Sequence, residues 1–446
     1  MENYIRKLAE IIDSIRYENL PQNVIEKVKT CVIDDLECCM SPMNDARGLA
    51  ALKSVPKDGA SSGSTIFGTG HTADAADAAY VNTVKACIAV RNDTSKIAVC
   101  HPGNIIVAVV LSLAEENHAS GEKIIEAIVA GYEAMIRFGT FLDGRLNPAW
   151  RYTAIFGPVG AAFAAAKICN LDVGQMASAA SFACHSCGGV NQWAVSGTGD
   201  DVFQNSAGSR NGIFSMRLAQ NGAKACPSII EGAAGIAAAF GIHDGYDILT
   251  KKYDDYLINT IIHKPIRSCV FVQNPCQAAY GLLQEHPDVN CENVAHIDVY
   301  VNTAGYVLPG TTNNEQVDTI TNAVMSIPYG VSNVIVNRTD KDLSFAPPFD
   351  AHVLELMHKC TVFEDKSYPS AGPQASRVKV TLSNGKMYEY ESPELTPLTD
   401  DEVKKLFLET CTCRIGAEKA NIALNLIEQL EKLNDCCGFT HILRAV

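Results

Sequence analysis

The stretch "RNDTSKIAVCHPGNIIVAVVLSLAEENHASGEKIIEAIVAGYEAMIRFG", residues 91–139, places a polar loop before two apolar segments. The first segment follows Pro102 and is almost continuously apolar, and the second repeats its apolar residues at helical spacing. Ser120 is a favourable N-cap, and Glu122 in the next turn suits the positive end of a helix. The stretch therefore predicts two buried helices, the first beginning near Asn104.

The polar loop contains two side chains that can move protons, Asp93 and His101. Imidazole changes its charge near neutral pH and is the commonest general acid or base. His101 directly precedes the predicted helix, whose positive end would favour an anionic ligand. A loop histidine also fits a purely structural role, so the pair alone leaves both interpretations open.

Helical signals continue outward from this stretch over residues 1–268, as in "PQNVIEKVKTCVIDDLECCM" and "GQMASAASFACHSC". Abundant Ala, Gly and Ser would let these helices approach one another closely. After Pro397 two amphipathic segments follow, "TDDEVKKLFLETC" and "GAEKANIALNLIEQLEKL", which can return to the same bundle. We therefore expect a large all-helical domain, residues 1–268, completed by residues 396–446.

The pattern changes between these two helical regions. "AHIDVYVNT", residues 295–303, alternates apolar and polar residues as a strand does. "VKVTLSNGKMYEYES", residues 378–392, is typical of a hairpin that turns at Asn384-Gly385. Helical spacing returns between these segments, so residues 269–395 predict a smaller α+β domain in a protein that is mainly α.

The chain has 446 residues and a formal net charge of −14. This charge argues against nucleic acid or an anionic membrane as partner, because both select for Lys and Arg. An anionic substrate would need a local cluster of cations. The N-terminus lacks the apolar stretch of a signal peptide, and no run approaches the ~20 apolar residues of a membrane span. We therefore expect a soluble, cytoplasmic protein.

Seventeen cysteines are scattered along the chain without framework spacing. Without a signal peptide, this distribution indicates reduced and mostly buried thiols. The pair Cys184 and Cys187 in "CHSC" resembles half of a zinc site, but it falls in a small-residue helix. We therefore expect no metal.

Two glycine-rich segments are candidate ligand sites. "STIFGTGHTADAADAAY", residues 64–80, lacks the third glycine of a dinucleotide fingerprint, since residue 73 is Ala. "GGVNQWAVSGTGDDVFQNSAGSRNG", residues 188–212, predicts a long loop that offers backbone N–H groups and amides to a ligand. No G-x-S-x-G nucleophile elbow occurs.

Residues 91–139 are similar to the core of the MmgE/PrpD family, which includes 2-methylcitrate dehydratase, cis-aconitate decarboxylase and iminodisuccinate epimerase. The likeness covers about residues 5–430 in family order. It continues in "FGTGHTADAADAAYVN", "YTAIFGPVGAAFAAAKICNLD", "NGIFSMRLAQNGAKACPSIIEGAAG" and "NAVMSIPYGVS". The resemblance implies a helical domain from both chain ends, an α+β lid domain and a homodimer. It also implies an active site in the cleft between the domains that needs neither metal nor organic cofactor.

Three residues match the family's motifs: His101 the histidine of "HP[GS]", Asp93 the last Asp of "D-x-D-D", and Tyr329 the tyrosine of "S-x-P-Y". Several other positions depart from the family. Val90 and Asn92 replace two aspartates of that run. Arg151 replaces a histidine, Gln204 stands where a histidine is frequent, a lysine position falls near Asp201, and a further histidine position falls near Gln273.

These matches lead to the hypothesis of a cofactor-independent enzyme that abstracts a proton α to a carboxylate of a small di- or tricarboxylate. His101 would be the base or acid, oriented by Asp93, and Tyr329 would donate a proton on the opposite face. An arginine can grip a carboxylate bidentately. The expected substrate-binding residues are Arg151, Gln204, Lys264, Arg267 and Gln273.

Three functions remain open at this point. Lyase chemistry, dehydration or decarboxylation, comes first by family resemblance. Epimerisation or isomerisation comes second, because it needs only two proton-transfer groups on opposite faces. An inactive member that binds a carboxylate is the third, because the family's lysine and two histidines are absent.

Overall fold

The computed structural model describes residues 3–41, 44–56, 63–369 and 374–444. Nineteen α-helices lie within these residues, so the prediction of a mainly α protein is confirmed. The helices of the first half are α1 (Tyr4–Asp13), α2 (Gln22–Met40), α3 (Ala46–Ser54), α4 (Ala75–Ile88), α5 (Gly103–Glu116), α6 (Gly121–Leu142), α7 (Tyr152–Ile168), α8 (Val173–Cys184), α9 (Gln192–Ser196) and α10 (Asp201–Gln220).

The helices after α10 are α11 (Ile236–Ala239), α12 (Val270–Glu285), α13 (Thr303–Val307), α14 (Ile320–Met325), α15 (Ile327–Asn337), α16 (Ala351–Met357), α17 (Asp400–Ile415), α18 (Ala417–Glu428) and α19 (Cys437–Ile442). Most of the helices after α10 are shorter; the longer ones are α12, α15, α17 and α18. Short 3-10 turns occupy Tyr17–Asn19, Tyr246–Thr250, Leu257–Thr260 and Leu430–Lys432.

The strands form two small ladders and one four-stranded sheet. The sheet has the order β6-β5-β7-β8; β5 and β6 run parallel, and the other two pairings are antiparallel. The strands are β1 (Ser64–Thr65), β2 (Thr72–Ala73), β3 (Thr94–Ser95), β4 (Ile261–Ile262), β5 (Val294–Val301), β6 (Cys360–Glu364), β7 (Gln374–Leu382) and β8 (Met387–Glu394). The predicted strand and hairpin are thus confirmed as β5 and β7–β8.

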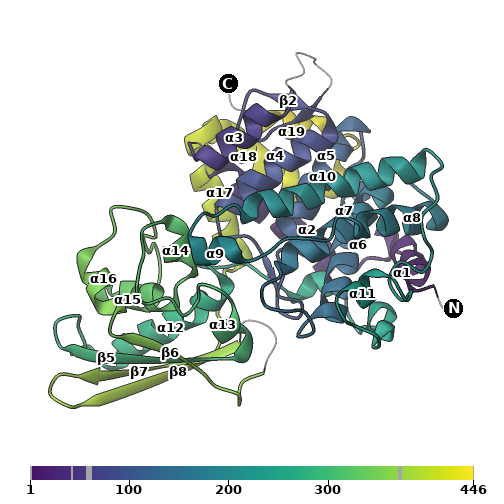
Figure 1. The fold of residues 1–446 in the computed structure, drawn as a ribbon. Coiled ribbons are helices and arrows are strands. Elements are labelled where there is room, and N and C mark those ends of the chain that lie inside the picture. Colours follow the sequence, from purple (N-terminus) through teal and green to yellow (C-terminus); the bar gives the residue numbers. More distant parts are fainter. Residues whose placement is uncertain (1–2, 42–43, 57–62, 370–373, 445–446) are drawn as a thin grey trace.

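One large hydrophobic core joins both ends of the chain. It takes residues from Tyr4 to Ile261 and again from Val403 to Leu443. In Figure 1 the yellow helices α17–α19 belong to the same body as the helices of the first half, and they contact α2 and α5. A capping box of Thr399 and Glu402 starts α17. The predicted return of the C-terminal helices to the first bundle is therefore confirmed.

The helices of this body approach closely where glycines face a neighbour. A Cβ atom at Gly212 of α10 would lie 2.3 Å from the Cβ of Ala161 in α7. A Cβ at Gly157 of α7 would lie 2.3 Å from Cδ1 of Ile105. Any larger side chain would push these helices apart. The small residues noted in the sequence therefore set the tight packing around α7.

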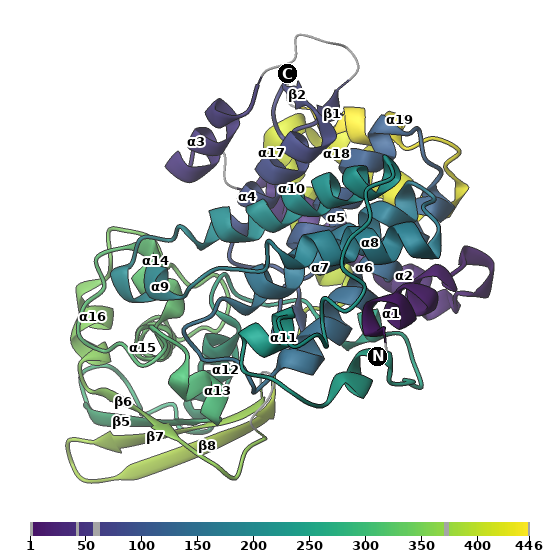
Figure 2. The ribbon, with the colours of Figure 1, turned by 45° about the vertical axis from the view of Figure 1, so that its right-hand side comes forward.

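A second core lies around the four-stranded sheet. It includes Val272 of α12, Val299 of β5, Val334 of α15 and Val378 of β7. Figures 1 and 2 both show α12, α13 and α15 against one face of this sheet, beside the helical body. Helix α9 lies between α8 and α10 in the chain but packs against the second core, through Trp193 and Ala194. The domain boundaries 1–268 with 396–446, and 269–395, stay predictions.

Residues 188–212 do not form the long loop expected from their composition. α9 occupies Gln192–Ser196, and α10 begins at Asp201. The glycines of "SGTG" separate the two helices, since Gly197 and Gly199 both adopt positive φ. The many Ser and Asn residues after Asp201 are accommodated because α10 packs along α4, α7 and α8. Tertiary packing outweighs their weak helix propensity.

All seventeen cysteines lie in the described residues and are free, and most are buried, as predicted. In the part of the chain that the structure describes, no helix combines the length and apolarity needed to cross a membrane.

Candidate active site

A cavity of about 400 Å³ lies where the two cores meet. Its lining includes three of the residues proposed from the sequence: His101, Arg151 and Lys264. They come from the loop before α5, the start of α7 and the segment after β4. His101 and Arg151 are 50 residues apart along the chain, and Arg151 and Lys264 are 113 residues apart. They share one cavity because the chain folds back between them.

His101 has a defined tautomer. Its Nδ1 lies 2.8 Å from the carbonyl oxygen of Asp93 and 3.0 Å from Oγ1 of Thr94. A carbonyl only accepts hydrogen bonds, so Nδ1 of the neutral ring carries the proton and donates it. The other nitrogen, Nε2, keeps its lone pair. A half-buried imidazole thus presents a basic atom at the cavity.

The surroundings keep this imidazole neutral. Burial, and then the positive charges of Lys264 and Arg151, hold the pKa of His101 well below its usual value. A neutral imidazole accepts a proton, whereas an imidazolium cannot. His101 is therefore suited to the role of a base at neutral pH.

Asp93 orients His101 through its backbone carbonyl, and not through its carboxylate. The carboxylate accepts hydrogen bonds from the backbone N–H of Gly103 at 2.9 Å and from the hydroxyl of Tyr132 at 2.7 Å. Burial raises the pKa of Asp93, although both hydrogen bonds work against that rise. Asp93 caps the start of α5, and only its backbone carbonyl holds His101. The sequence cannot distinguish these two roles of one residue.

Arg151 lies at the N-cap of α7 and faces the cavity. Its guanidinium forms an ion pair with Asp201 at 3.3 Å and lies 5.2 Å from the centre of the Trp193 ring. Its Nε is buried and has no hydrogen-bond partner. Burial raises the pKa of Asp201, and Arg151 opposes that rise. Arg151 thus brings a cation to the cavity, while its Nε is covered by the protein.

Lys264 reaches the cavity because of a short ladder. β3 in the loop before His101 pairs with β4, so Thr94 lies opposite Ile262. Nζ of Lys264 donates to the carbonyl oxygens of Val90 at 2.6 Å and Ser268 at 2.9 Å. Burial lowers the pKa of Lys264 to about 8. Lys264 is therefore a positively charged neighbour of His101 at pH 7.

Tyr329 does not line this cavity. The predicted arrangement, in which the Tyr329 hydroxyl faces the His101 ring across the substrate, is therefore not found. Its hydroxyl donates to the carbonyl oxygen of Ser344 at 3.3 Å, and its ring packs against Phe345 and Phe349. Tyr329 is 2% exposed and belongs to the second core. In this structure its side chain holds α15 against the segment around residue 345.

Three predicted substrate-binding residues also lie outside the cavity lining. Nε2 of Gln204 donates to the carbonyl oxygen of Val190 at 3.1 Å. Gln273 is buried and holds both backbone groups of Ile266, at 3.1 and 2.9 Å. Arg267 pairs with Glu37 at 2.9 Å. Gln273 and Arg267 are held by the protein itself, and Gln204 is held through its Nε2 while its Oε1 has no partner. A residue-by-residue match to a family cannot reveal these contacts.

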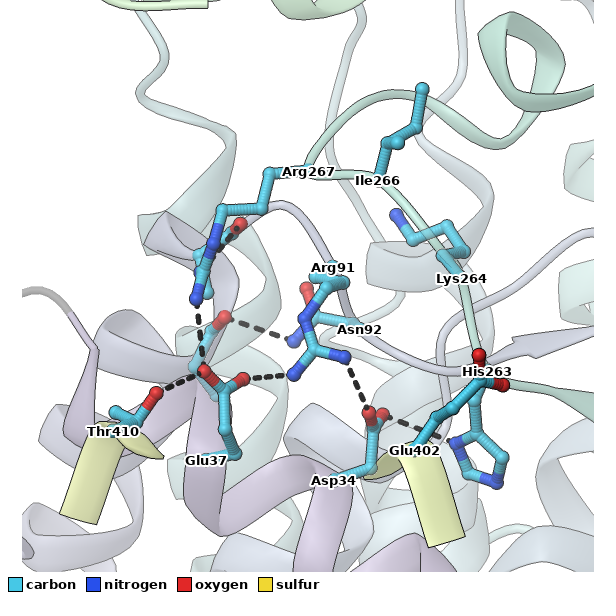
Figure 3. Close-up of polar contacts among 12 residues, drawn as sticks. Asp34, Glu37, Arg91, Asn92, His263, Lys264, Ile266, Arg267, Glu402 and Thr410 are labelled. Atoms are coloured by element: carbon cyan, nitrogen blue, oxygen red, sulfur yellow. Dashed lines mark hydrogen bonds and ion pairs between the residues drawn. The ribbon is translucent and has the colours of Figure 1, made fainter. Parts of the chain in front are cut away.

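Arg267 belongs to a buried network of charges that Figure 3 shows. Glu37 of α2 contacts Arg267, Arg91 and the hydroxyl of Thr410 in α17. Asp34 lies 3.4 Å from Arg91 and 3.3 Å from Nδ1 of His263. This "α2 network" (Asp34, Glu37, Arg91, His263, Arg267 and Thr410) ties the loop of His101 to both chain ends and to the segment that carries Lys264.

The cavity also has lining residues that the sequence arguments did not select. Asn191 and Trp193 come from α9 and its approach, and Asp201 and Asn205 from the start of α10. Asn191 Oδ1, Trp193 Nε1 and Asn205 Oδ1 are buried without hydrogen-bond partners. Buried polar atoms normally have a hydrogen-bond partner, so these three are exceptions among the lining residues. The polar stretch 188–212 was the only signal for them.

The backbone beside His101 is strained at two lining residues. Val90 has φ 55° and Val99 has φ 42°. A β-branched residue with positive φ is an outlier, and such strain is concentrated at functional sites. The strain therefore supports the choice of this cavity as the functional site.

One further group of metal-ligand types occurs among the described residues. His118, Asp435 and Cys437 bring ligand atoms within 4.8 Å of one another. The group is largely exposed and lies at the other end of α5 from His101.

The comparison with protein families gives two matches. The MmgE/PrpD N-terminal domain matches residues 6–249, and the MmgE/PrpD C-terminal domain matches residues 267–432. No curated protein matches the chain. The two domains cover most of the sequence in consecutive order, and the chain belongs to the MmgE/PrpD family.

Proposed function

We propose that this protein is a lyase that removes a proton α to a carboxylate, with His101 as the base. Membership of the MmgE/PrpD family supports a dehydratase- or decarboxylase-type enzyme at the level of the family. The observation that carries the proposal is the tautomer of His101: the Asp93 carbonyl holds Nδ1–H, and Nε2 remains unprotonated at a cavity shared with two cations.

The carboxylate would bind between Arg151 and Lys264. Arg151 lines the cavity, and the N-terminus of α7 adds a positive helix end. Lys264 is protonated below pH about 8. These cations form the local positive cluster that an anionic substrate needs in a chain of net charge −14.

Dehydration then needs one base and one acid. Nε2 of His101 takes the proton from the carbon α to the carboxylate, and the C–H electron pair forms the new C=C bond. The C–O bond of the neighbouring carbon breaks, and the leaving hydroxide takes a proton from Lys264 to become water. The charge that develops on the carboxylate is stabilised by Arg151.

Epimerisation is the weaker candidate. It requires a second proton-transfer group that faces His101 across the substrate. Tyr329 was the expected group, but its hydroxyl is bound to Ser344 in the second core. The expected homodimer and independence of cofactors stay predictions drawn from the family.

The proposal is tested by following malate, citrate and 3-butylmalate in D₂O by proton NMR. We expect deuterium at the α carbon and alkene signals of the elimination product. His101→Gln should reduce the rate by about 10²–10⁴-fold, the usual contribution of a positioned base. His185→Gln is the matched control, because His185 is exposed and does not line the cavity.

Two results would contradict this function. If His101→Gln exchanges deuterium at a rate within tenfold of the parent rate, His101 is not the base. Binding of these acids with neither exchange nor elimination would favour the inactive, carboxylate-binding member instead.

A further inference from the structure

The cavity has a marked chemical asymmetry. Its charged side chains all belong to residues up to 264: the cations are Arg47, Arg151 and Lys264, and the acidic residues are Asp143 and Asp201, of which Asp201 is paired with Arg151. The described lining residues after Cys269 carry no charge, and threonines are their only polar members. One end of the cavity therefore suits an acid group, and the wall supplied by the second core suits apolar atoms.

This wall is formed by large apolar side chains from four short segments. They come from the start of α12, the end of α13, the turn after it, and α14, namely Phe271, Val307, Leu308, Pro309, Val324 and Met325. Ile320 at the start of α14 completes the lining. We call these seven residues the apolar wall.

Parts of the apolar wall remain exposed. Val307 is 43% exposed and Ile320 is 41% exposed, although both line a cavity. Burying such apolar surface under a ligand is favourable, and most ligand pockets are lined mainly by apolar groups. A carboxylate placed there would lose its hydration without gaining a hydrogen-bond partner, which is costly.

We propose that the substrate carries its carboxylate at one end and an apolar chain of several carbons at the other, with the apolar wall as the binding site for that chain. This inference deepens the proposed function and rests on it. A cavity of about 400 Å³ lies in the range of about 300–1,000 Å³ that is usual for ligands of drug size. Compact, fully charged tricarboxylates would leave the apolar wall unfilled.

The chain-length dependence of binding tests this inference without any turnover. Calorimetry of the parent protein with succinate, 2-butylsuccinate and 2-hexylsuccinate gives the three Kd values. Each added methylene that reaches the apolar wall should lower Kd by roughly two- to fourfold. The ratio of Kd for succinate to Kd for hexylsuccinate measures the contribution of the apolar chain.

Two isoleucines of equal exposure provide a matched pair of variants. Ile320→Ser should reduce that ratio by at least fivefold, because Ile320 lines the cavity. Ile422→Ser should leave the ratio as in the parent, because Ile422 of α18 is 43% exposed but does not line it. Both side chains are solvent-exposed, so neither serine is expected to disturb folding.

The outcomes separate this inference from the proposed function. Equal Kd values for the three succinates, or an equal loss of the ratio in both variants, would overturn the apolar chain site while exchange in D₂O still supports the lyase. Failure of every succinate to bind would overturn the inference as well. The absence of exchange in D₂O would independently mark the failure of the proposed function.

Discussion

Two charged clusters start from the same loop and differ in how their members are satisfied. In the α2 network, Arg91 is 2% exposed and Glu37 is fully buried, and each faces an opposite charge from the same chain. In the cavity, Arg151 is 18% exposed, Lys264 donates to backbone carbonyl oxygens and not to a carboxylate, and Nε2 of His101 is unprotonated. A cluster of buried charges is therefore not enough to identify a functional site. The α2 network holds segments of the chain together, whereas the cavity retains groups that can bind a ligand.

The electrostatics differ in the same way. Burial works to raise the pKa of Asp34 in the α2 network, but His263 and Arg91 outweigh it and the pKa lies below its usual value. In the cavity, burial and nearby cations prevail and depress the pKa of His101 and Lys264, although the Asp93 carbonyl and Asp34, respectively, act in the opposite direction. The first arrangement stabilises charges, whereas the second destabilises them, as is frequent at functional sites.

The largest expected effect concerns stability. Arg91→Met should lower the free energy of unfolding by about 3–5 kcal/mol, because it leaves Asp34 and Glu37 as buried carboxylates that lack this partner. Arg267→Met is the control, since Arg267 is 40% exposed and such pairs contribute about 0–1 kcal/mol. Urea denaturation measures both. Equal losses would contradict the distinction between buried and exposed members of the α2 network.

The second prediction concerns the pH dependence of catalysis, which depends on the depressed pKa values of the groups in the cavity. The pKa of His101 lies well below 6.5, so the neutral base is present at pH 6.5 and kcat/KM should not yet decline there. Protonated Lys264 attracts the carboxylate and loses its charge above pH about 8, so kcat/KM should fall by about tenfold per unit above that pH.

The control for this profile is Lys264→Arg, because arginine keeps its charge at every pH used. Arginine replaces the acid Lys264 poorly, so kcat should be lower, and the pH dependence of the remaining kcat/KM is the readout. The decline above pH 8 should then move to higher pH. An acid limb centred near pH 6.5, or an alkaline limb that survives in Lys264→Arg, would assign the titration to other groups.

The smallest expected effect concerns Tyr329. Tyr329→Phe removes one hydrogen bond to Ser344, whose carbonyl keeps the bond from Asn333 at 2.7 Å. We expect a stability loss of about 0.5–1.5 kcal/mol and a change in kcat of less than about twofold. A loss of more than about 100-fold in kcat, with the protein still folded, would return Tyr329 to the chemistry and require the cavity to rearrange around it.

Most elements near the site could be predicted from local patterns. The sequence places a helix after Pro102 and another after Ser120, and α5 and α6 begin at Gly103 and Gly121. The side chain of Ser120 accepts a hydrogen bond from the backbone N–H of Lys123, as the N-cap argument requires. Helical periodicity and N-capping involve residues close together in the chain, so they can be recognised from the sequence.

The partners of the site residues could not be predicted in this way. β3 and β4 have two residues each and show no strand pattern, yet their pairing brings Lys264 to His101. Asn191 and Trp193 line the cavity because α9 packs toward the second core. These placements depend on packing between segments far apart in the chain.

The sequence by itself determined the mainly helical fold, the strand and hairpin of the second core, and the position of His101 before a buried helix. The tertiary structure alone decided which groups face the cavity: it assigned the Asp93 carboxylate to Tyr132, Arg267 to Glu37 and Tyr329 to Ser344. The physical reason is that backbone propensity is local. A side chain's protonation and availability depend instead on every charge and apolar group that folding brings around it.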